Sequence, residues 1–233
     1  MRMRKKPNLS SRMEKCSSLL VTDPSALRGR WLSFAQDQPR IVQPQGKTSL
    51  PNGKEPDAPM YGELRIELGC GKGRFTVETA KAEPSVLLVA LEKSADAMVI
   101  AMERAAADEI QNARFVNAFA DDVLSYFAPE EASRIYLNFC DPWPSNRHAK
   151  RRLTHRRFLE LYAQILRPRG EVHFKTDNLP LFEFSLREFA QLGFEVSEET
   201  RDLHKDGPVG VMTDYEMKFF NQGLPICRCV AKR

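Results

Sequence analysis

The chain has 233 residues, a formal net charge of +4 and 42% hydrophobic residues. This length fits one α/β domain, and the apolar content is sufficient for a sizeable core. No stretch approaches the roughly 20 apolar residues that a membrane span requires. The basic start MRMRKK is followed by a short apolar run at 19–21, too short for a signal peptide. We therefore expect a soluble, cytoplasmic protein with no membrane association.

The cysteines and histidines predict no metal site. The five cysteines include no C-x-x-C pair, and the four histidines do not follow them at zinc-finger spacing. The histidines also form no helix-face pair with acids at ligand spacing. A reduced, intracellular setting and a protein without a bound metal are the simplest interpretation.

The chain divides into three parts by composition. Residues 1–40 form a basic N-terminal arm with one short helix expected near 24–34. Residues 41–60, rich in proline and glycine, are expected to be a flexible surface linker. Residues 61–233 carry the regular patterns of a folded domain.

In this last part, short apolar runs alternate with helical patterns. Strands are expected at 63–69, 86–92, 113–119, 134–140, 171–177 and 194–200, with a last strand at 224–232. Helices are expected from residue 74 and at 94–107, 154–166 and 179–192. This alternation predicts an α/β fold with a mainly parallel sheet and helices on both faces. Ligands of such sheets bind at the carboxyl ends of the strands, so 69–73, 92, 119–121, 141 and 177 are the positions of interest.

The first loop, in IELGCGKGRF, favours a nucleoside ligand. Gly69, Gly71 and Gly73 allow close backbone approach and a sharp turn into a helix. The third glycine is one place early for a dinucleotide fingerprint, and no Walker A motif is present. Glu67 suits a cationic amino group, such as that of S-adenosylmethionine, and Glu92 suits ribose hydroxyls. The alternative is a plain glycine turn beside a solvated acid.

The fourth loop, NFCDPWP, presents one acid beside a basic run. Pro142 and Pro144 stiffen the loop around Asp141, and Trp143 offers a flat face. No acidic residue lies between Asp141 and Glu160, whereas this segment contains Arg147, Lys150, Arg151, Arg152, Arg156 and Arg157, with His148 and His155 among them. This run predicts contacts with a phosphate backbone. The alternative for the loop is a buried turn with a structural tryptophan.

Together, IELGCGKGRF, ALEKS, YLNFCDPWPSNRHAKRRL, HFKTDN and VMTDYEMKF resemble the bacterial tRNA (guanine-N7-)-methyltransferases. The resemblance runs from MRMRKKP to the last strand and omits the linker. It implies a Rossmann-like class I methyltransferase fold with an antiparallel C-terminal strand. It also implies methyl transfer from S-adenosylmethionine to N7 of a guanine in the variable loop of tRNA. A monomer and a homodimer are both compatible with the sequence.

The resemblance also implies roles for individual residues. Cofactor contacts would come from Glu67, Gly69, Gly71, Gly73, Glu92, Lys93, Phe119, Ala120 and Asp141, and Asp141 would also be the catalytic acid. Substrate contacts would come from Ser145, Asp177, Thr213, Asp214, Tyr215 and Glu216, and RNA contacts from Arg147, His148, Lys150, Arg151 and Arg152.

Three features depart from the family pattern. The family often has N-x-D-A after the third strand, where this chain has Phe119 in place of the acid, so Asp121 or a backbone N–H would replace its hydrogen bond. The family commonly has a lysine where this chain has Ser145, and the linker is longer than usual.

Two other functions stay open at this stage. The loop has some likeness to the [ND]-P-P-[YW] loop of exocyclic amino methylases, although Trp143 replaces the second proline. A cofactor-free RNA-binding protein on a Rossmann scaffold is the second alternative, and the presence of both Glu67 and Glu92 disfavours it.

Overall fold

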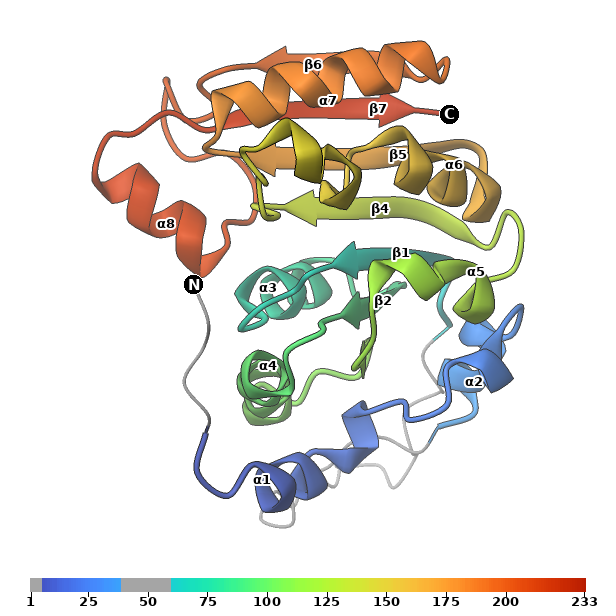
Figure 1. Ribbon diagram of the computed structural model, residues 1–233. Helices are drawn as coiled ribbons and strands as arrows, with labels where there is room; N and C mark the ends of the chain where they lie inside the picture. Colours follow the sequence, from blue (N-terminus) through green and yellow to red (C-terminus); the bar gives the residue numbers. More distant parts are fainter. Residues whose placement is uncertain (1–5, 39–59) are drawn as a thin grey trace.

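The computed structural model describes residues 6–38 and 60–233 (Figure 1). The predicted linker at 41–60 lies outside the described residues except for Met60, and so do the first five residues of the chain.

The described residues form a seven-stranded sheet with the order β3-β2-β1-β4-β5-β7-β6. The strands are β1 (Glu63–Leu68), β2 (Val86–Leu91), β3 (Ala113–Val116), β4 (Ala132–Asn138), β5 (Leu166–Thr176), β6 (Glu195–Thr200) and β7 (Cys227–Lys232). Neighbours from β3 to β5 are parallel, whereas β7 is antiparallel to both β5 and β6. The predicted parallel α/β sheet with an antiparallel last strand is thus confirmed.

Helices cover both faces of this sheet. They are α1 (Leu9–Lys15), α2 (Trp31–Gln36), α3 (Arg74–Ala82), α4 (Ala95–Ala107), α5 (Val123–Tyr126), α6 (Arg156–Ile165), α7 (Leu179–Gln191) and α8 (Asp214–Asn221). Short 3-10 helices are η1 (Ser17–Leu19), η2 (Ser25–Leu27), η3 (Ala120–Asp122) and η4 (Asn146–Arg151). One core holds side chains of α2, α5, α6 and α7, and a second holds those of α1, α3 and α4.

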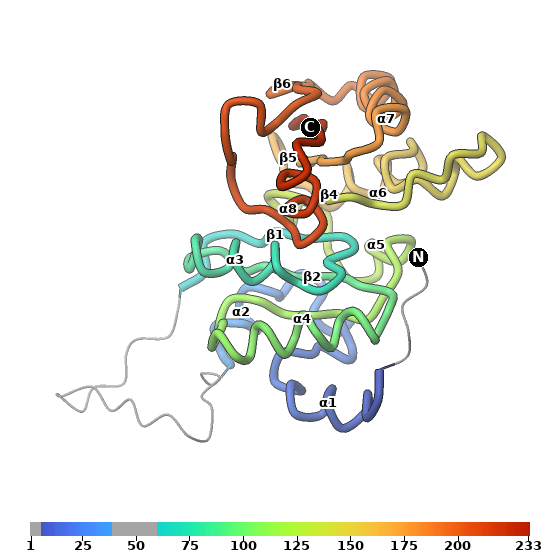
Figure 2. Tube along the Cα trace, turned by 90° about the vertical axis from the view of Figure 1, so that its left-hand side faces the viewer, coloured from blue at the N-terminus to red at the C-terminus, as the bar shows by residue number. Residues whose placement is uncertain are grey.

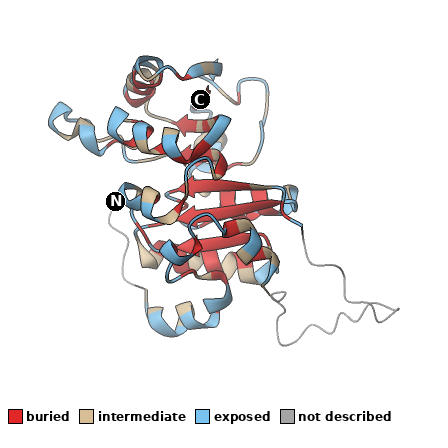
Figure 3. Cartoon of the chain, turned by 90° about the vertical axis from the view of Figure 1, so that its right-hand side faces the viewer, coloured by how far each residue is buried: buried red, intermediate tan, exposed pale blue. Residues whose placement is uncertain are grey.

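The strands β1 to β4 and β7 are largely buried, whereas the outer strand β6 is mostly exposed (Figure 3). Along β1, Leu64, Ile66 and Leu68 belong to the first core, so the alternation of a strand turns Glu67 toward the opposite face. That face is covered by α3, whose Thr76 hydroxyl reaches the Glu67 carboxylate at 2.5 Å. A strand-end acid is therefore enclosed rather than solvated.

The described part of the N-terminal segment packs on the domain instead of extending as an arm. Figures 1 and 2 show α1 beside α4, on the side of the molecule opposite β6. Val21 N–H donates to the Phe115 carbonyl oxygen of β3 at 2.9 Å, and the Arg12 guanidinium holds Glu103 of α4 at 2.6 Å. The N-terminal segment, despite its basic composition, thus contributes side chains to both cores.

Trp31 is the anchor of this segment. Its side chain is 0% exposed, its ring stacks on Phe127 at 5.5 Å between centroids, and its Nε1 donates to the Tyr126 carbonyl oxygen at 2.9 Å. The tryptophan therefore joins α2 to the end of α5.

Replacing this tryptophan should destabilise the protein strongly. Trp31→Ala leaves a cavity in the first core, and we expect the free energy of unfolding to fall by about 3–5 kcal/mol. Urea denaturation followed by circular dichroism measures this loss. Met60→Ala is the control, because Met60 is 84% exposed and a change of less than about 0.5 kcal/mol is expected there. A similarly small change for Trp31→Ala would show that the segment does not contribute to the core.

Candidate active site

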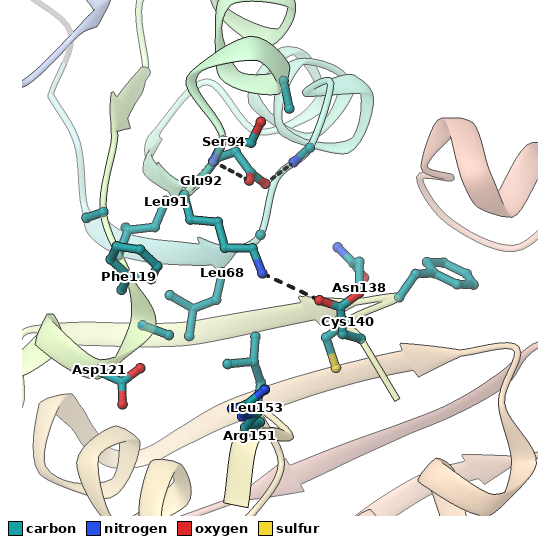
Figure 4. A pocket seen from close by; sticks show the side chains of 18 of the residues that line it. Leu68, Leu91, Glu92, Ser94, Phe119, Asp121, Asn138, Cys140, Arg151 and Leu153 are labelled. Atoms are coloured by element: carbon teal, nitrogen blue, oxygen red, sulfur yellow. Dashed lines mark hydrogen bonds and ion pairs between the residues drawn. The ribbon is translucent and has the colours of Figure 1, made fainter. Parts of the chain in front are cut away.

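A cavity of about 940 Å³ lies at the carboxyl edge of the sheet. Its walls include the last residues of three strands, Leu68 of β1, Leu91 of β2 and Asn138 of β4, together with the loops that follow them (Figure 4). Parallel strands bring their carboxyl ends to one edge, which is the expected position of a ligand site.

The three glycines of the first loop have different roles. Gly69, Gly71 and Gly73 have φ values of 84°, 56° and 76°, in the left-handed region that favours glycine. Gly69 and Gly71 line the cavity, whereas Gly73 does not. A Cβ on Gly73 would lie 2.4 Å from the Cβ of Ala101 on α4. We therefore correct the expected cofactor contact of Gly73: it is a packing residue between α3 and α4.

Glu92 ties the first two loops together. Its Oε2 accepts from the Gly71 N–H at 3.0 Å and its Oε1 accepts from the Ser94 N–H at 2.8 Å (Figure 4). Each carboxylate oxygen retains a second acceptor site, and Glu92 lines the cavity. The geometry therefore preserves the predicted capacity to accept hydrogen bonds from a sugar.

Glu67 lies behind the cavity wall and is not among the lining residues, so its contact with the cofactor stays a prediction. It is 1% exposed, and burial raises its pKa to about 7. Hydrogen bonds from Thr76 and Asn138 and the charge of Lys175 act in the opposite direction and lower this pKa. The Asn138 Nδ2 donates to its Oε1 at 3.2 Å, while the buried Asn138 Oδ1 has no partner. Glu67 thus holds Asn138, a cavity residue that the sequence reasoning missed.

Asp141 faces the open side of the cavity. Its carboxylate is 62% exposed and lies 3.4 Å from the Nζ of Lys93, which comes from the loop after β2. An ion pair this exposed contributes little stability. Both residues line the cavity, so Asp141 and Lys93 are where the sequence predicted, and their contact is easily exchanged for one with a ligand.

The loop around Asp141 is held in an unusual conformation. Phe139 and Trp143 both have positive φ, 54° and 42°, which costs on the order of 1–3 kcal/mol each. The Arg152 guanidinium compensates, since it donates to the carbonyl oxygens of Pro142 and Trp143, each at 3.0 Å. Arg152 is only 8% exposed. Arg152 therefore holds the loop in place, and its predicted contact with RNA stays untested and is disfavoured by this burial.

Fewer cations of the basic run are available for a ligand than the sequence suggests. Arg156 pairs with Glu188 of α7 at 3.0 Å, and Arg157 pairs with Asp121 of η3. Acids from other elements thus neutralise part of a run that contains no acid of its own. The residues of the run that stay outside these contacts are Arg147, His148, Lys150 and Arg151, on η4.

Two members of η4 cluster on the tryptophan of the loop. The Arg151 guanidinium lies 4.9 Å from the centroid of the Trp143 ring, and His148 meets the same ring edge-on at 5.8 Å. Arg151 also lines the cavity. The predicted RNA-contacting residues, without Arg152, therefore begin at the cavity wall and extend away from it.

The loop after β3 forms another wall. Phe119, Ala120 and Asp121 line the cavity, and the Phe119 side chain is 58% exposed (Figure 4). The Asn117 Nδ2 donates to the Glu92 carbonyl oxygen at 2.7 Å and fixes the start of this loop. Ser145 is exposed and does not line the cavity.

The predicted substrate residues of 213–216 divide into one exposed side chain and three anchored ones. Tyr215 is 47% exposed, and its ring lies 5.2 Å from that of Phe139. Thr213 caps α8, and the Asp214 carboxylate lies 2.6 Å from the Arg104 guanidinium. Glu216 is 0% exposed, so its contact with the substrate stays a prediction that this burial does not favour.

Asp177, the other residue predicted from HFKTDN, lies beside Tyr215. Burial raises the pKa of Tyr215, and the charge of Asp177 and a hydrogen bond to it add to the effect. Tyr215 thus links the loop after β4 with the loop after β5.

The fold and this cavity define a Rossmann-like class I methyltransferase. Solved methyltransferase structures share this fold. The 16S rRNA methyltransferase KamB matches with a TM-score of 0.57 and 18% identity, covering 74% of this chain and 88% of that chain. A 16S rRNA (adenine-N1)-methyltransferase variant from Catenulisporales acidiphilia, solved with its cosubstrate SAM, has a TM-score of 0.54, 15% identity, and coverages of 74% and 86%.

Sequence relatives define the family. The model of a putative methyltransferase family matches residues 62–229. The tRNA (guanine-N(7)-)-methyltransferase of Geobacillus thermodenitrificans is 41% identical over 235 residues, covering 100% of this chain and 98% of the relative. That of Bacillus cytotoxicus is 38% identical, with coverages of 100% and 97%. The chain belongs to the bacterial tRNA (guanine-N7-)-methyltransferase family.

The described residues contain neither a metal-binding cluster nor a membrane-spanning helix. No group of three or more His, Cys, Asp or Glu side chains within 6–38 and 60–233 is arranged to hold a metal ion. None of the helices in these ranges combines the length and apolar character needed to cross a membrane.

The buried Glu67 predicts a specific pH dependence of stability. Its pKa is about 7 in the folded chain against an ordinary 4.5, so the unfolded chain releases this proton first as pH rises. Stability from this residue is full below about pH 4.5 and is lost as pH rises toward 7. Glu67→Gln should therefore gain up to roughly 3 kcal/mol over the unmodified protein between pH 5 and pH 8.

Urea denaturation of both proteins at the two pH values measures this difference. Glu78→Gln is the control, because that side chain is 46% exposed. A difference between Glu67→Gln and the unmodified protein that does not change with pH would contradict the raised pKa.

Proposed function

We propose that this protein transfers a methyl group from S-adenosylmethionine to N7 of a guanine in the variable loop of tRNA. The observation that carries the proposal is the open carboxylate of Asp141 at the junction of the cavity with the exposed basic residues of η4. Full-length relatives are named for guanine-N7 methylation of tRNA.

The cavity residues fit S-adenosylmethionine. Asn138 Oδ1 is a buried acceptor without a partner at the cavity wall, which suits the ammonium group of the methionine portion. Glu92 retains acceptor capacity for ribose hydroxyls, and Phe119 offers an exposed aromatic face beside it. Ala97 and Leu91 add apolar surface for the adenine ring.

The reaction asks this chain mainly for positioning. The bound cofactor supplies an electrophilic methyl group on a sulfonium, and guanine N7 carries a lone pair without a proton at neutral pH. No strong general base is needed, so alignment of the two groups supplies most of the rate. A rigid loop that fixes Asp141 relative to the cavity meets this requirement.

Asp141 has two tasks in this mechanism. Its oxygens accept hydrogen bonds from guanine N1–H and the exocyclic amine, and its charge stabilises the positive charge that methylation places on the purine. The guanine replaces the Lys93 ammonium as its partner, which costs little because that pair is exposed. Tyr215 and Asp177 border the same position and contact the guanine or its neighbours.

Removal of the carboxylate should abolish most turnover. For Asp141→Ala we expect kcat to fall by at least about a hundredfold, because a preorganised electrostatic contact to the transition state is lost. Asp141→Asn keeps the shape and removes the charge, so it should show most of the same loss. The rate of methyl incorporation into tRNA from labelled S-adenosylmethionine is the measurement. Near-normal kcat in both variants would exclude this role.

The exposed residues of η4 should control affinity for tRNA and its dependence on salt. Neutralising both Arg147 and Lys150 removes two phosphate contacts, so the slope of log affinity against log salt should fall by roughly 1.4 to 1.8. Filter binding at several salt concentrations measures it.

A matched pair of arginines serves as the control. Arg167→Gln with Arg169→Gln removes two exposed charges at the start of β5, at the opposite edge of the sheet from the cavity. The slope should stay unchanged in this variant. An unchanged slope in the η4 variant as well would show that Arg147 and Lys150 do not touch phosphate.

The modified atom decides between the proposed reaction and its closest alternative. Unmodified tRNA is incubated with the protein and labelled S-adenosylmethionine, digested to nucleosides and analysed by mass spectrometry. The proposal requires 7-methylguanosine, whereas a guanosine or adenosine methylated on its exocyclic amine would support the amino-methylase alternative. Binding of the cofactor without any transfer would support an RNA-binding protein instead.

A further inference from the structure

The first turn of α8 is anchored by a buried network that the transfer reaction does not use directly. Glu216 is 0% exposed, and its Oε2 lies 2.7 Å from the Nζ of Lys175, at the end of β5. Lys175 is only 8% exposed and also donates to the Val211 carbonyl oxygen at 3.0 Å. One buried ion pair therefore fixes both the helix and the loop before it to the sheet.

His204 completes the network from the other side. Its Nε2 lies 3.0 Å from the Glu216 Oε1, and its Nδ1 accepts from the Val209 N–H at 3.2 Å. Because Nδ1 accepts, the proton of a neutral ring is on Nε2, which donates to the carboxylate. The Thr213 N–H donates to Oε2 at 3.2 Å, so both oxygens of Glu216 are engaged.

This anchoring determines where Tyr215 lies. Glu216 and Asp214 are its chain neighbours, and each is tied to a different part of the fold: Glu216 to β5, and Asp214 to Arg104 of α4 at 2.6 Å. Between them, Tyr215 is 47% exposed and packs on Phe139. Phe139 itself lines the cavity. The anchored neighbours thus leave Tyr215 partly exposed beside a residue of the cavity wall.

We propose that Lys175 and His204 are positioning residues for the transfer reaction: through Glu216 they hold α8 so that Tyr215 presents its ring to the tRNA nucleotide at the cavity. The proposal rests on the proposed function for the identity of that nucleotide. In this role Lys175 and His204 do not contact the substrate, and they act through the helix.

The test must avoid a buried unpaired charge, since removal of one partner alone destabilises the fold. The main variant is therefore Lys175→Met with Glu216→Gln, and His204→Ala is a milder second variant that keeps the ion pair. Arg12→Gln with Glu103→Gln is the control, because it removes an ion pair between α1 and α4.

We expect kcat/KM for tRNA to fall at least tenfold in the main variant and less in His204→Ala. Calorimetric affinity for S-adenosylhomocysteine should change less than threefold, because the cavity walls are unaltered. The control variant should keep both values. Loss of cofactor affinity in parallel with kcat/KM would overturn the proposal, and so would unchanged kcat/KM.

A double-mutant cycle separates positioning from general damage. Tyr215→Ala alone should lower kcat/KM by a similar factor, and adding it to the main variant should cause little further loss, because both changes remove the same contact. Full additivity, or no effect of Tyr215→Ala, would overturn the proposal.

Amide hydrogen exchange of α8 tests the positioning role without measuring methyl transfer. An unmodified protein that methylates no tRNA would disprove the proposed function alone. Exchange at the α8 amides should then still rise at least tenfold in the main variant and His204→Ala, while exchange in α4 and α6 stays constant. Unchanged exchange in α8 would overturn the positioning role.

Discussion

The buried ammonium of Lys175 is the interaction on which the site depends. It pairs directly with Glu216 at 2.7 Å, and its charge also favours the ionised form of Glu67. A cation near a buried acid favours the ionised form of that acid. Burial lowers the pKa of Lys175, and Glu216 opposes this effect. One residue at the end of β5 thus fixes α8 by a direct ion pair and acts on Glu67 by its charge alone.

The loop that carries Asp141, the proposed reacting carboxylate, contains unfavourable local conformations. Phe139 and Trp143 lie in the left-handed region without being glycine, and such residues persist only where the surroundings determine them. The Arg152 contacts with the loop carbonyls and the packing of Phe139 on Tyr215 are those surroundings. Asp141 can therefore stay exposed and still be held in place, which a flexible loop would not allow.

The sequence predicted the sheet well because strand alternation and helix periodicity are local signals. It located the cavity through the rule on strand ends, and Gly69, Gly71, Glu92 and Asp141 lie there. Its errors came from partners distant in the chain. Glu188 and Asp121 neutralise arginines of a run without acids, and Ala101 explains Gly73.

The sequence contains a local signal for the start of α8. Thr213 and Glu216 have the spacing of a capping box, and the structure shows both of its hydrogen bonds. That pattern predicts the start of a helix at Asp214 and an inward role for the glutamate. The burial of Trp31 had a weaker signal, because a basic segment with scattered apolar residues gives no clear periodicity before its partners are known.

The separation of charges explains how one surface can serve two ligands. If all six cations of the run were free, they would draw phosphate into the cavity that must accept a nucleoside with its own cationic groups. Arg157 is instead neutralised by Asp121 at the cavity wall, and Arg152 is buried in the loop. Within the described residues, the cations of η4 form no ion pair, unlike Arg156 and Arg157, and Arg151 is stacked on Trp143 at the boundary. In the proposed function, the attraction for RNA is thereby confined to one side of Asp141, and the cofactor side keeps its acids.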